Sequence, residues 1–195
     1  TLTGWQSLRD ELVKRITAEF GSEYNESNIM ITATHTHATP GGITHQTLYN
    51  ITTLGFHKDT FDAQVNGALK AIHQATDDLA PGNLTISSSQ LTDVGVNRSK
   101  EAFDRNPQEL RSKLPNGTDP TNMTLRLERN GKVRAVLNWY ALHPTSLTSK
   151  NTLISSDNKG YAEYLLENQD HGVDRNVPGS GDGFVAAFAN ANAGD

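Results

Sequence analysis

Two histidines separated by a single residue are the first side chains in the sequence whose type and spacing could support chemistry. His35 and His37 follow a short apolar run and precede a Pro-Gly-Gly break at residues 40–42. The run is brief and contains two isoleucines, so residues 28–33 are predicted to form a buried strand. Because side chains alternate along a strand, both imidazoles are expected on the same face. Neutral imidazole binds zinc and also transfers protons, so the pair predicts either part of a metal site or one ligand beside an acid–base group.

A third histidine, His143, extends this prediction. It ends a second predicted strand, at a point where the chain again breaks at a proline. Two separate strands thus carry imidazoles to their ends, where loops gather and functional sites are built. A catalytic zinc needs at least three protein ligands. If His35 and His143 are two of them, then either His37 is the third or the remaining ligands lie beyond residue 195.

Two further polar residues are candidates for the same site. Arg98 lies in a glycine-containing loop, where its planar fork of donors could hold an anionic or carbonyl oxygen. The alternative for Arg98 is a solvated surface arginine. Asp157 precedes a predicted helix, where it would either cap the helix or orient a histidine. The sequence contains no phosphate-binding glycine loop, nucleophile elbow or His-Glu-x-x-His motif that would indicate a different chemistry.

The elements that must position these side chains are helices and strands in mixed order. Apolar residues that recur every three or four positions indicate amphipathic helices, and Asn130-Gly131 between two alternating segments is typical of a β-hairpin turn. The predicted helices cover residues 5–20, 61–79, 107–114 and 158–168, the predicted strands cover 28–33, 84–91, 123–128, 133–142 and 184–188, and residues 38–58 form a loop. The last helix is expected to turn Tyr161, Leu165 and Leu166 inward. This order predicts a mixed α/β (α+β) fold, with mixed β-sheets flanked by helices, rather than a doubly wound parallel sheet.

Composition limits the classes of partner and compartment. The 195 residues carry a net charge of -5 without a basic block, which argues against nucleic acid as a partner. The absence of cysteine excludes disulfides and thiolate zinc sites within the chain. No segment reaches the ~18 apolar residues of a transmembrane helix. A secreted or cell-surface glycoprotein is favoured by Asn-x-Ser/Thr triplets, with unused triplets in polar loops as the alternative; they begin at Asn25, Asn50, Asn83, Asn97, Asn116 and Asn122.

An ordered series of motifs across nearly the whole chain resembles the neutral/alkaline ceramidases. The motifs are Thr34-His-Thr-His37 with Pro40-Gly-Gly42, Asn97-Arg-Ser99, Asn138-Trp-Tyr-Ala-Leu-His-Pro-Thr-Ser146, Ser156-Asp-Asn-Lys-Gly-Tyr-Ala162 and Phe184-Val-Ala-Ala-Phe188. After the first motif the family has serine and a small residue, where this chain has Ala38-Thr39. The resemblance implies an enzyme that hydrolyses the amide bond of ceramide to sphingosine and a fatty acid, using one zinc ion held by two histidines, a glutamate and a tyrosine.

The resemblance also implies roles for individual residues. His35 and His143 would be zinc ligands, and His37 and Arg98 would be catalytic and substrate-binding residues. Residues 1–195 would form part of a single zinc-dependent catalytic domain truncated at both ends, with the other ligands and an essential serine beyond Asp195. The partner would be ceramide at a membrane or micelle surface. Two alternatives are an inactive sphingolipid-binding relative and a zinc amidase that acts on soluble acyl-amides.

Overall fold

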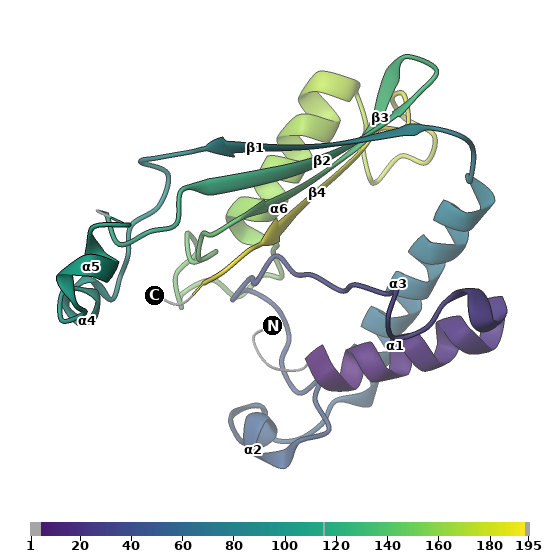
Figure 1. Ribbon diagram of the computed structural model, residues 1–195. Coiled ribbons are helices and arrows are strands. Elements are labelled where there is room, and N and C mark those ends of the chain that lie inside the picture. Colours follow the sequence, from purple (N-terminus) through teal and green to yellow (C-terminus); the bar gives the residue numbers. More distant parts are fainter. Residues whose placement is uncertain (1–4, 115, 194–195) are drawn as a thin grey trace. The chain divides into compact units, whose positions relative to one another are not determined.

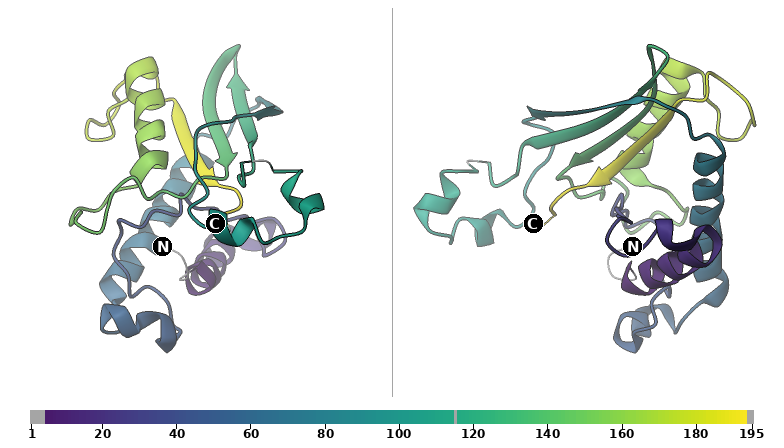
Figure 2. Two further views of the ribbon diagram at one scale, coloured as in Figure 1. Left: turned by 90° about the vertical axis from the view of Figure 1, so that its left-hand side faces the viewer. Right: turned by 45° about the vertical axis from the view of Figure 1, so that its right-hand side comes forward.

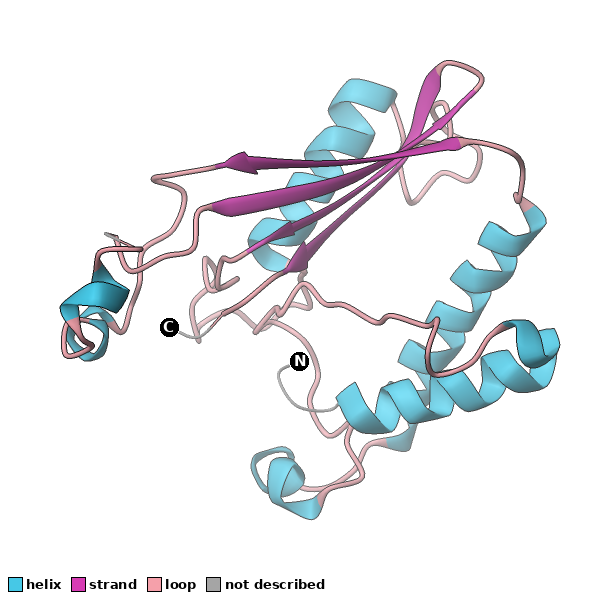
Figure 3. Cartoon of the chain, in the orientation of Figure 1, coloured by secondary structure: helices cyan, strands magenta, loops and turns pink. Residues whose placement is uncertain are grey.

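The structure, a computed structural model, describes residues 5–114 and 116–193 (Figure 1). Its internal contacts divide the chain into two compact units. The first, here called the helical unit, comprises the chain up to Thr32 together with His37–Pro81 and Asn151–Ser155. The second, here called the sheet unit, comprises Ala33–Thr36, Gly82–Lys150 and the chain from Ser156 onward. Figure 3 shows that regular helices dominate the first unit, whereas all the strands drawn belong to the second.

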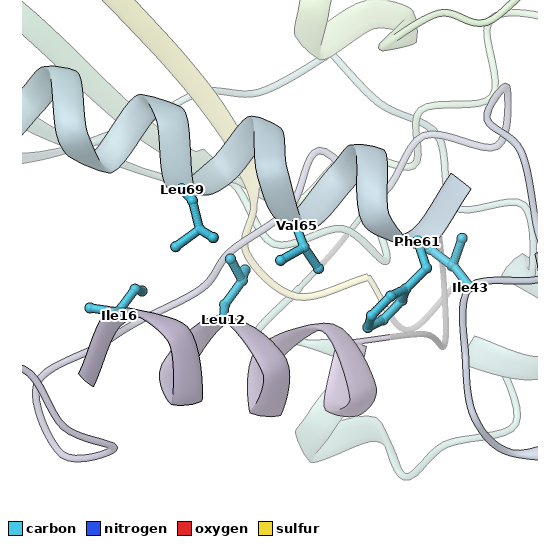
Figure 4. Close-up of a cluster of buried hydrophobic side chains, with 6 residues drawn as sticks. All are labelled: Leu12, Ile16, Ile43, Phe61, Val65 and Leu69. Carbon is cyan, nitrogen blue, oxygen red and sulfur yellow. The ribbon is translucent and has the colours of Figure 1, made fainter. Parts of the chain in front are cut away.

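The helical unit is built on the two long amphipathic helices that the sequence predicts, α1 (Trp5–Phe20) and α3 (Lys58–Asp77). The chain leaves α1 through Gly21, whose φ of +75° is the left-handed conformation that glycine adopts without strain. α3 ends before Leu79, which the pattern had included and which is exposed. Side chains from both helices and from one loop residue meet in a buried cluster (Figure 4), formed by Leu12, Ile16, Ile43, Phe61, Val65 and Leu69.

The segment between these helices differs from the sequence prediction. Residues 28–33 form no strand. Residues 38–57 do form the expected connection, which contains α2 (Thr47–Asn50) and the short helix η2 (Ile51–Thr53), and α3 begins at Lys58. Ile29 and Ile31 instead pack against the buried cluster of the helical unit. A short apolar run can bury its side chains against helices as well as in a sheet, and periodicity cannot separate the two cases.

The sheet unit contains a four-stranded mixed sheet in the order β1-β2-β3-β4, which confirms the predicted mixed α/β class. β1 (Asn83–Gln90), β2 (Thr121–Arg129) and β3 (Lys132–Tyr140) are antiparallel, and β4 (Val185–Asn190) runs parallel to β3. The β2–β3 hairpin turns at Asn130 and Gly131, both with positive φ, as a two-residue primed turn requires. Figure 2 shows the strands from two further directions.

The sheet unit also contains helices, of which α6 (Asp157–Tyr164) lies against the strands and α4 (Lys100–Phe103) and α5 (Gln108–Arg111) lie away from them (Figure 1). α4 and α5 are single turns, and α6 continues as a π-helical segment, Leu165–Asp170. The inward prediction for Tyr161 is wrong, since this side chain is 62% exposed. Two carboxylates of this helical segment bind β4: Glu163 and Glu167 accept the backbone N–H groups of Phe188 and Ala186 at 3.0 and 2.9 Å. No described helix combines the length and apolar character needed to cross a membrane.

Two of the Asn-x-Ser/Thr triplets are closed to modification in the folded chain. Asn50 and Asn97 are buried, and their side-chain amides donate to the carbonyls of Thr44 and Gly117 at 2.6 and 2.7 Å. A glycan on either amide would remove a buried hydrogen bond and require space that the fold does not provide. Solvent-accessible acceptors are found instead at Asn25, Asn83 and Asn116.

Candidate functional site

The sheet unit brings His35 and His143 together, although they are far apart in the sequence. Their ring centroids are 4.9 Å apart with an interplanar angle of 80°, and each ring offers a nitrogen within 4.8 Å of a nitrogen of the other. Both residues are half-buried. Two neutral imidazoles at this separation form a donor pair that suits a single Zn²⁺, for which tetrahedral nitrogen ligation is usual.

The local backbone at His35 is not that of a strand. His35 has a φ of +66°, in the left-handed region that histidine visits more often than most residues. Alternation along a strand therefore does not apply, and the prediction that His35 and His37 share a strand face is wrong. His37 is exposed and belongs to the helical unit. Its role in catalysis or substrate binding stays a prediction.

Arg98 contacts the site directly. Its Nη2 lies 2.8 Å from Nε2 of His143. A guanidinium only donates hydrogen bonds, so Nε2 of His143 is the acceptor in this contact. The single lone pair of that nitrogen cannot bind a metal ion at the same time, so the guanidinium would have to leave Nε2 when a metal ion binds there. Arg98 is exposed, as the surface-arginine alternative predicts, but its guanidinium also contacts this nitrogen of His143.

The Asp157 carboxylate organises the loop that follows His143. It accepts backbone N–H bonds from Ser146 at 3.1 Å, from Leu147 at 3.0 Å and from Asn158 at 2.6 Å. Burial raises the pKa of this carboxyl, but the hydrogen bonds outweigh burial and hold the pKa below its ordinary value. Asp157 therefore fixes the loop beside His143, and the residue that precedes the helix as its cap is Ser156.

Replacing Asp157 with asparagine tests this role, because asparagine tolerates the φ of +56° at this position. At pH 7 the free energy of unfolding should fall by roughly 1.5–3 kcal/mol, the range for hydrogen bonds to charged groups. Folding lowers the pKa of the Asp157 carboxyl below its ordinary value of 3.8. The carboxylate therefore stabilises the folded protein fully above pH 3.8, and this contribution is lost as the pH falls through the lower pKa of the folded state. Denaturant unfolding of both proteins should show a difference that closes below about pH 4. A difference that does not change with pH would contradict the assignment.

A cavity of about 420 Å³ lies against the two residues that form the Arg98–His143 hydrogen bond. Ser146 and Asn158 contribute polar groups to its wall, and the Asn158 amide also donates to the His143 carbonyl at 3.3 Å. The sequence does not indicate Asn158 as part of the site, because an asparagine at a helix start is explained by the helix alone. The cavity can accept a polar group next to an arginine and a histidine.

The residues present fit a zinc site in part. Two histidine nitrogens, one from His35 and one from His143, supply half of a four-coordinate shell. A catalytic site needs at least one more protein ligand. The described residues of the sheet unit therefore provide an incomplete set of ligands with suitable chemistry.

Comparisons with known proteins identify the family of the chain. Residues 1–195 match the family described as neutral/alkaline non-lysosomal ceramidase, N-terminal. The chain is 42% identical to the neutral ceramidase of Mycobacterium tuberculosis, over 97% of this chain and 30% of that protein. It superposes on the crystal structure of neutral ceramidase from Pseudomonas aeruginosa with a TM-score of 0.86 and 39% identity, covering 97% of this chain and 29% of that one. The chain thus spans less than a third of these relatives, and it belongs to the neutral/alkaline non-lysosomal ceramidase family.

Proposed function

We propose that this chain supplies two zinc ligands, His35 and His143, to an enzyme that hydrolyses the amide bond of ceramide. The observation that carries the proposal is the convergence of the two imidazoles, with ring centroids 4.9 Å apart, beside the Arg98 guanidinium. The names of the relatives, neutral ceramidase in M. tuberculosis and in P. aeruginosa, support ceramide as the substrate. The products would be sphingosine and a fatty acid, as in sphingolipid metabolism.

The chemistry divides between the metal ion and the side chains of this chain. When bound, a zinc ion polarises the amide carbonyl and lowers the pKa of a coordinated water towards ~7. His143 is held by the loop that Asp157 fixes, and its Nε2, which accepts from Arg98 in this structure, would bind the metal ion once that hydrogen bond is released. The Arg98 guanidinium, next to that nitrogen, would then donate to the negative oxygen that develops on the substrate. We assign His37 to substrate contact or proton transfer.

Metal analysis together with a substrate panel tests this proposal in the complete protein. We expect about one zinc per molecule and hydrolysis of a fluorescent ceramide, with little activity on acyl-peptides. Stoichiometric zinc with preference for acyl-peptides would indicate an amidase for soluble acyl-amides. Ceramide binding without zinc and without hydrolysis would indicate an inactive sphingolipid-binding relative. Either result would overturn the proposed activity.

We also propose that the enzyme takes its substrate from a membrane or micelle surface through the exposed segment 47–56. Leu48, Ile51 and Leu54 are 74%, 64% and 94% exposed. Residues 41–57 contain no acidic residue, and Lys58 after them is paired with Asp62. Exposed apolar side chains in a segment without acidic residues suit contact with the lipid interface.

The double substitution Ile51→Ser and Leu54→Ser should weaken lipid binding. Full burial of one such side chain contributes about 1.5–3 kcal/mol. Loss of even partial insertion of two of them should therefore lower vesicle affinity by at least roughly tenfold. Sedimentation with phosphatidylcholine vesicles that contain ceramide measures the change. Leu79→Ser is the matched control, because Leu79 is 73% exposed in the same unit but outside the segment. Equal vesicle affinity of the double variant and the control would contradict the proposal.

Secretion or cell-surface location is a further part of the proposal. It rests on the Asn-x-Ser/Thr triplets, of which Asn25, Asn83 and Asn116 are exposed.

A further inference from the structure

Asn190, the last residue of β4, makes two hydrogen bonds that reach both histidine-bearing segments. Its backbone N–H donates to the carbonyl of Ala33 at 2.6 Å, and its side-chain Oδ1 accepts from the backbone N–H of Leu142 at 2.9 Å. Ala33 lies two residues before His35, and Leu142 lies directly before His143. A single residue therefore connects the two chain segments whose imidazoles meet.

The strand that carries Asn190 is held along both of its edges. On one edge β4 pairs with β3, where Asn190 lies opposite Tyr140. On the other edge the N–H groups of Ala186 and Phe188 donate to the carboxylates of Glu167 and Glu163. The N–H of Asn190 continues this alternating series with the Ala33 carbonyl as its acceptor. The segment that bears His35 is thus attached to a fixed strand edge.

On the side that precedes His143, the segment that bears this histidine is held at Tyr140 and at Leu142. The Tyr140 carbonyl accepts the N–H of Ala191 at 3.3 Å and the buried ammonium of Lys159 at 2.8 Å, which fixes the end of β3. Beyond that point the N–H of Leu142 is bound by the Asn190 side chain. The amide oxygen of Asn190 is therefore the contact that restrains the residue next to His143.

We propose that Asn190 is a positioning residue that sets the separation of the His35 and His143 imidazoles; this inference rests on the proposed metal site. Ligand distances in a metal site must be met within about 0.2 Å, so restraint of both ligand segments from one residue favours binding. Within the described chain the buried Nδ2 of Asn190 makes no hydrogen bond. The role of the side chain therefore depends on Oδ1, which aspartate retains and alanine removes.

Titration of the complete, metal-depleted protein with Zn²⁺ and Co²⁺ tests the inference. Asn190→Ala should weaken metal binding about 10–100-fold, as loss of a residue that orients a ligand typically does. Asn190→Asp keeps the acceptor but places a carboxylate oxygen at the buried position of Nδ2, so it should bind metal more tightly than the alanine variant even where it lowers the melting temperature. The visible spectrum of bound Co²⁺ should shift only in the alanine variant. Asn138→Ala is the control, because the side-chain amide of Asn138 donates hydrogen bonds within the same sheet, to Asn122, Met123 and Thr124. That variant should lower the melting temperature without changing metal affinity.

The possible failures are distinguishable. Unchanged metal affinity and spectrum in Asn190→Ala would overturn the positioning role, whatever happens to the melting temperature. Equal loss of metal affinity in the aspartate and alanine variants would also overturn the positioning role, because the hydrogen-bond acceptor would then not determine metal binding. An unsubstituted protein that binds neither metal would instead overturn the proposed zinc site itself.

Discussion

Substitution of His143 by glutamine is expected to abolish zinc retention and ceramide hydrolysis in the complete protein. Glutamine is a poor zinc ligand, yet its side-chain oxygen can still accept a hydrogen bond from Arg98, so the loop should remain in place. Metal affinity should fall by at least about 100-fold, the upper end of what loss of a supporting residue costs. Metal analysis after dialysis and an assay with fluorescent ceramide measure the two effects.

His35→Asn should give the same result, and asparagine is chosen because it also tolerates the positive φ at this position. The control is His73→Gln, which alters an exposed histidine that contacts Glu19 on the helical unit. This control should keep both zinc and activity. If either the His143 or the His35 variant retained full zinc and full activity, the ligand assignment would be wrong.

Arg98→Ala is expected to lower turnover by about 10²–10³ while zinc is retained. The size follows from the loss of one donor aimed at the developing negative oxygen. Zinc should be retained because the positive guanidinium lies 2.8 Å from Nε2 of His143, the nitrogen at which the zinc ion would bind. Removal of a competing positive charge cannot weaken binding of a metal ion at that nitrogen. Steady-state kinetics and metal analysis on the same preparation test both statements.

Arg98→Lys separates charge from geometry, since lysine keeps the charge but lacks the planar fork of donors. It should recover only part of the lost turnover. Arg105→Ala, which removes an exposed arginine after α4, is the control and should behave like the unsubstituted protein. Loss of zinc together with activity in Arg98→Ala would assign Arg98 to the stability of the site instead of to the reaction.

Local features of the fold could be predicted from the sequence because they depend on residues close together in the chain. The spacing of apolar residues specified α1 and α3, whose side chains meet in the buried cluster of the helical unit. The Asn130-Gly131 pair specified the β2–β3 turn, because both residues accept the positive φ of a two-residue loop. The ordered motifs also predicted the family, which the comparisons confirm.

Long-range contacts decided the rest, and no local pattern encodes them. Residues 28–33 looked like a strand, but the side chains of Ile29 and Ile31 pack against helices. β4 joins β3 in parallel, and the N–H of its last residue then binds the Ala33 carbonyl. The sequence by itself identified His35 and His143 as histidines at the ends of predicted strands and Arg98 as a loop arginine that could join their site. Only the tertiary structure decided that His35 and His143 face each other and that Arg98 binds His143, because those contacts depend on hydrogen bonds between segments far apart in the chain.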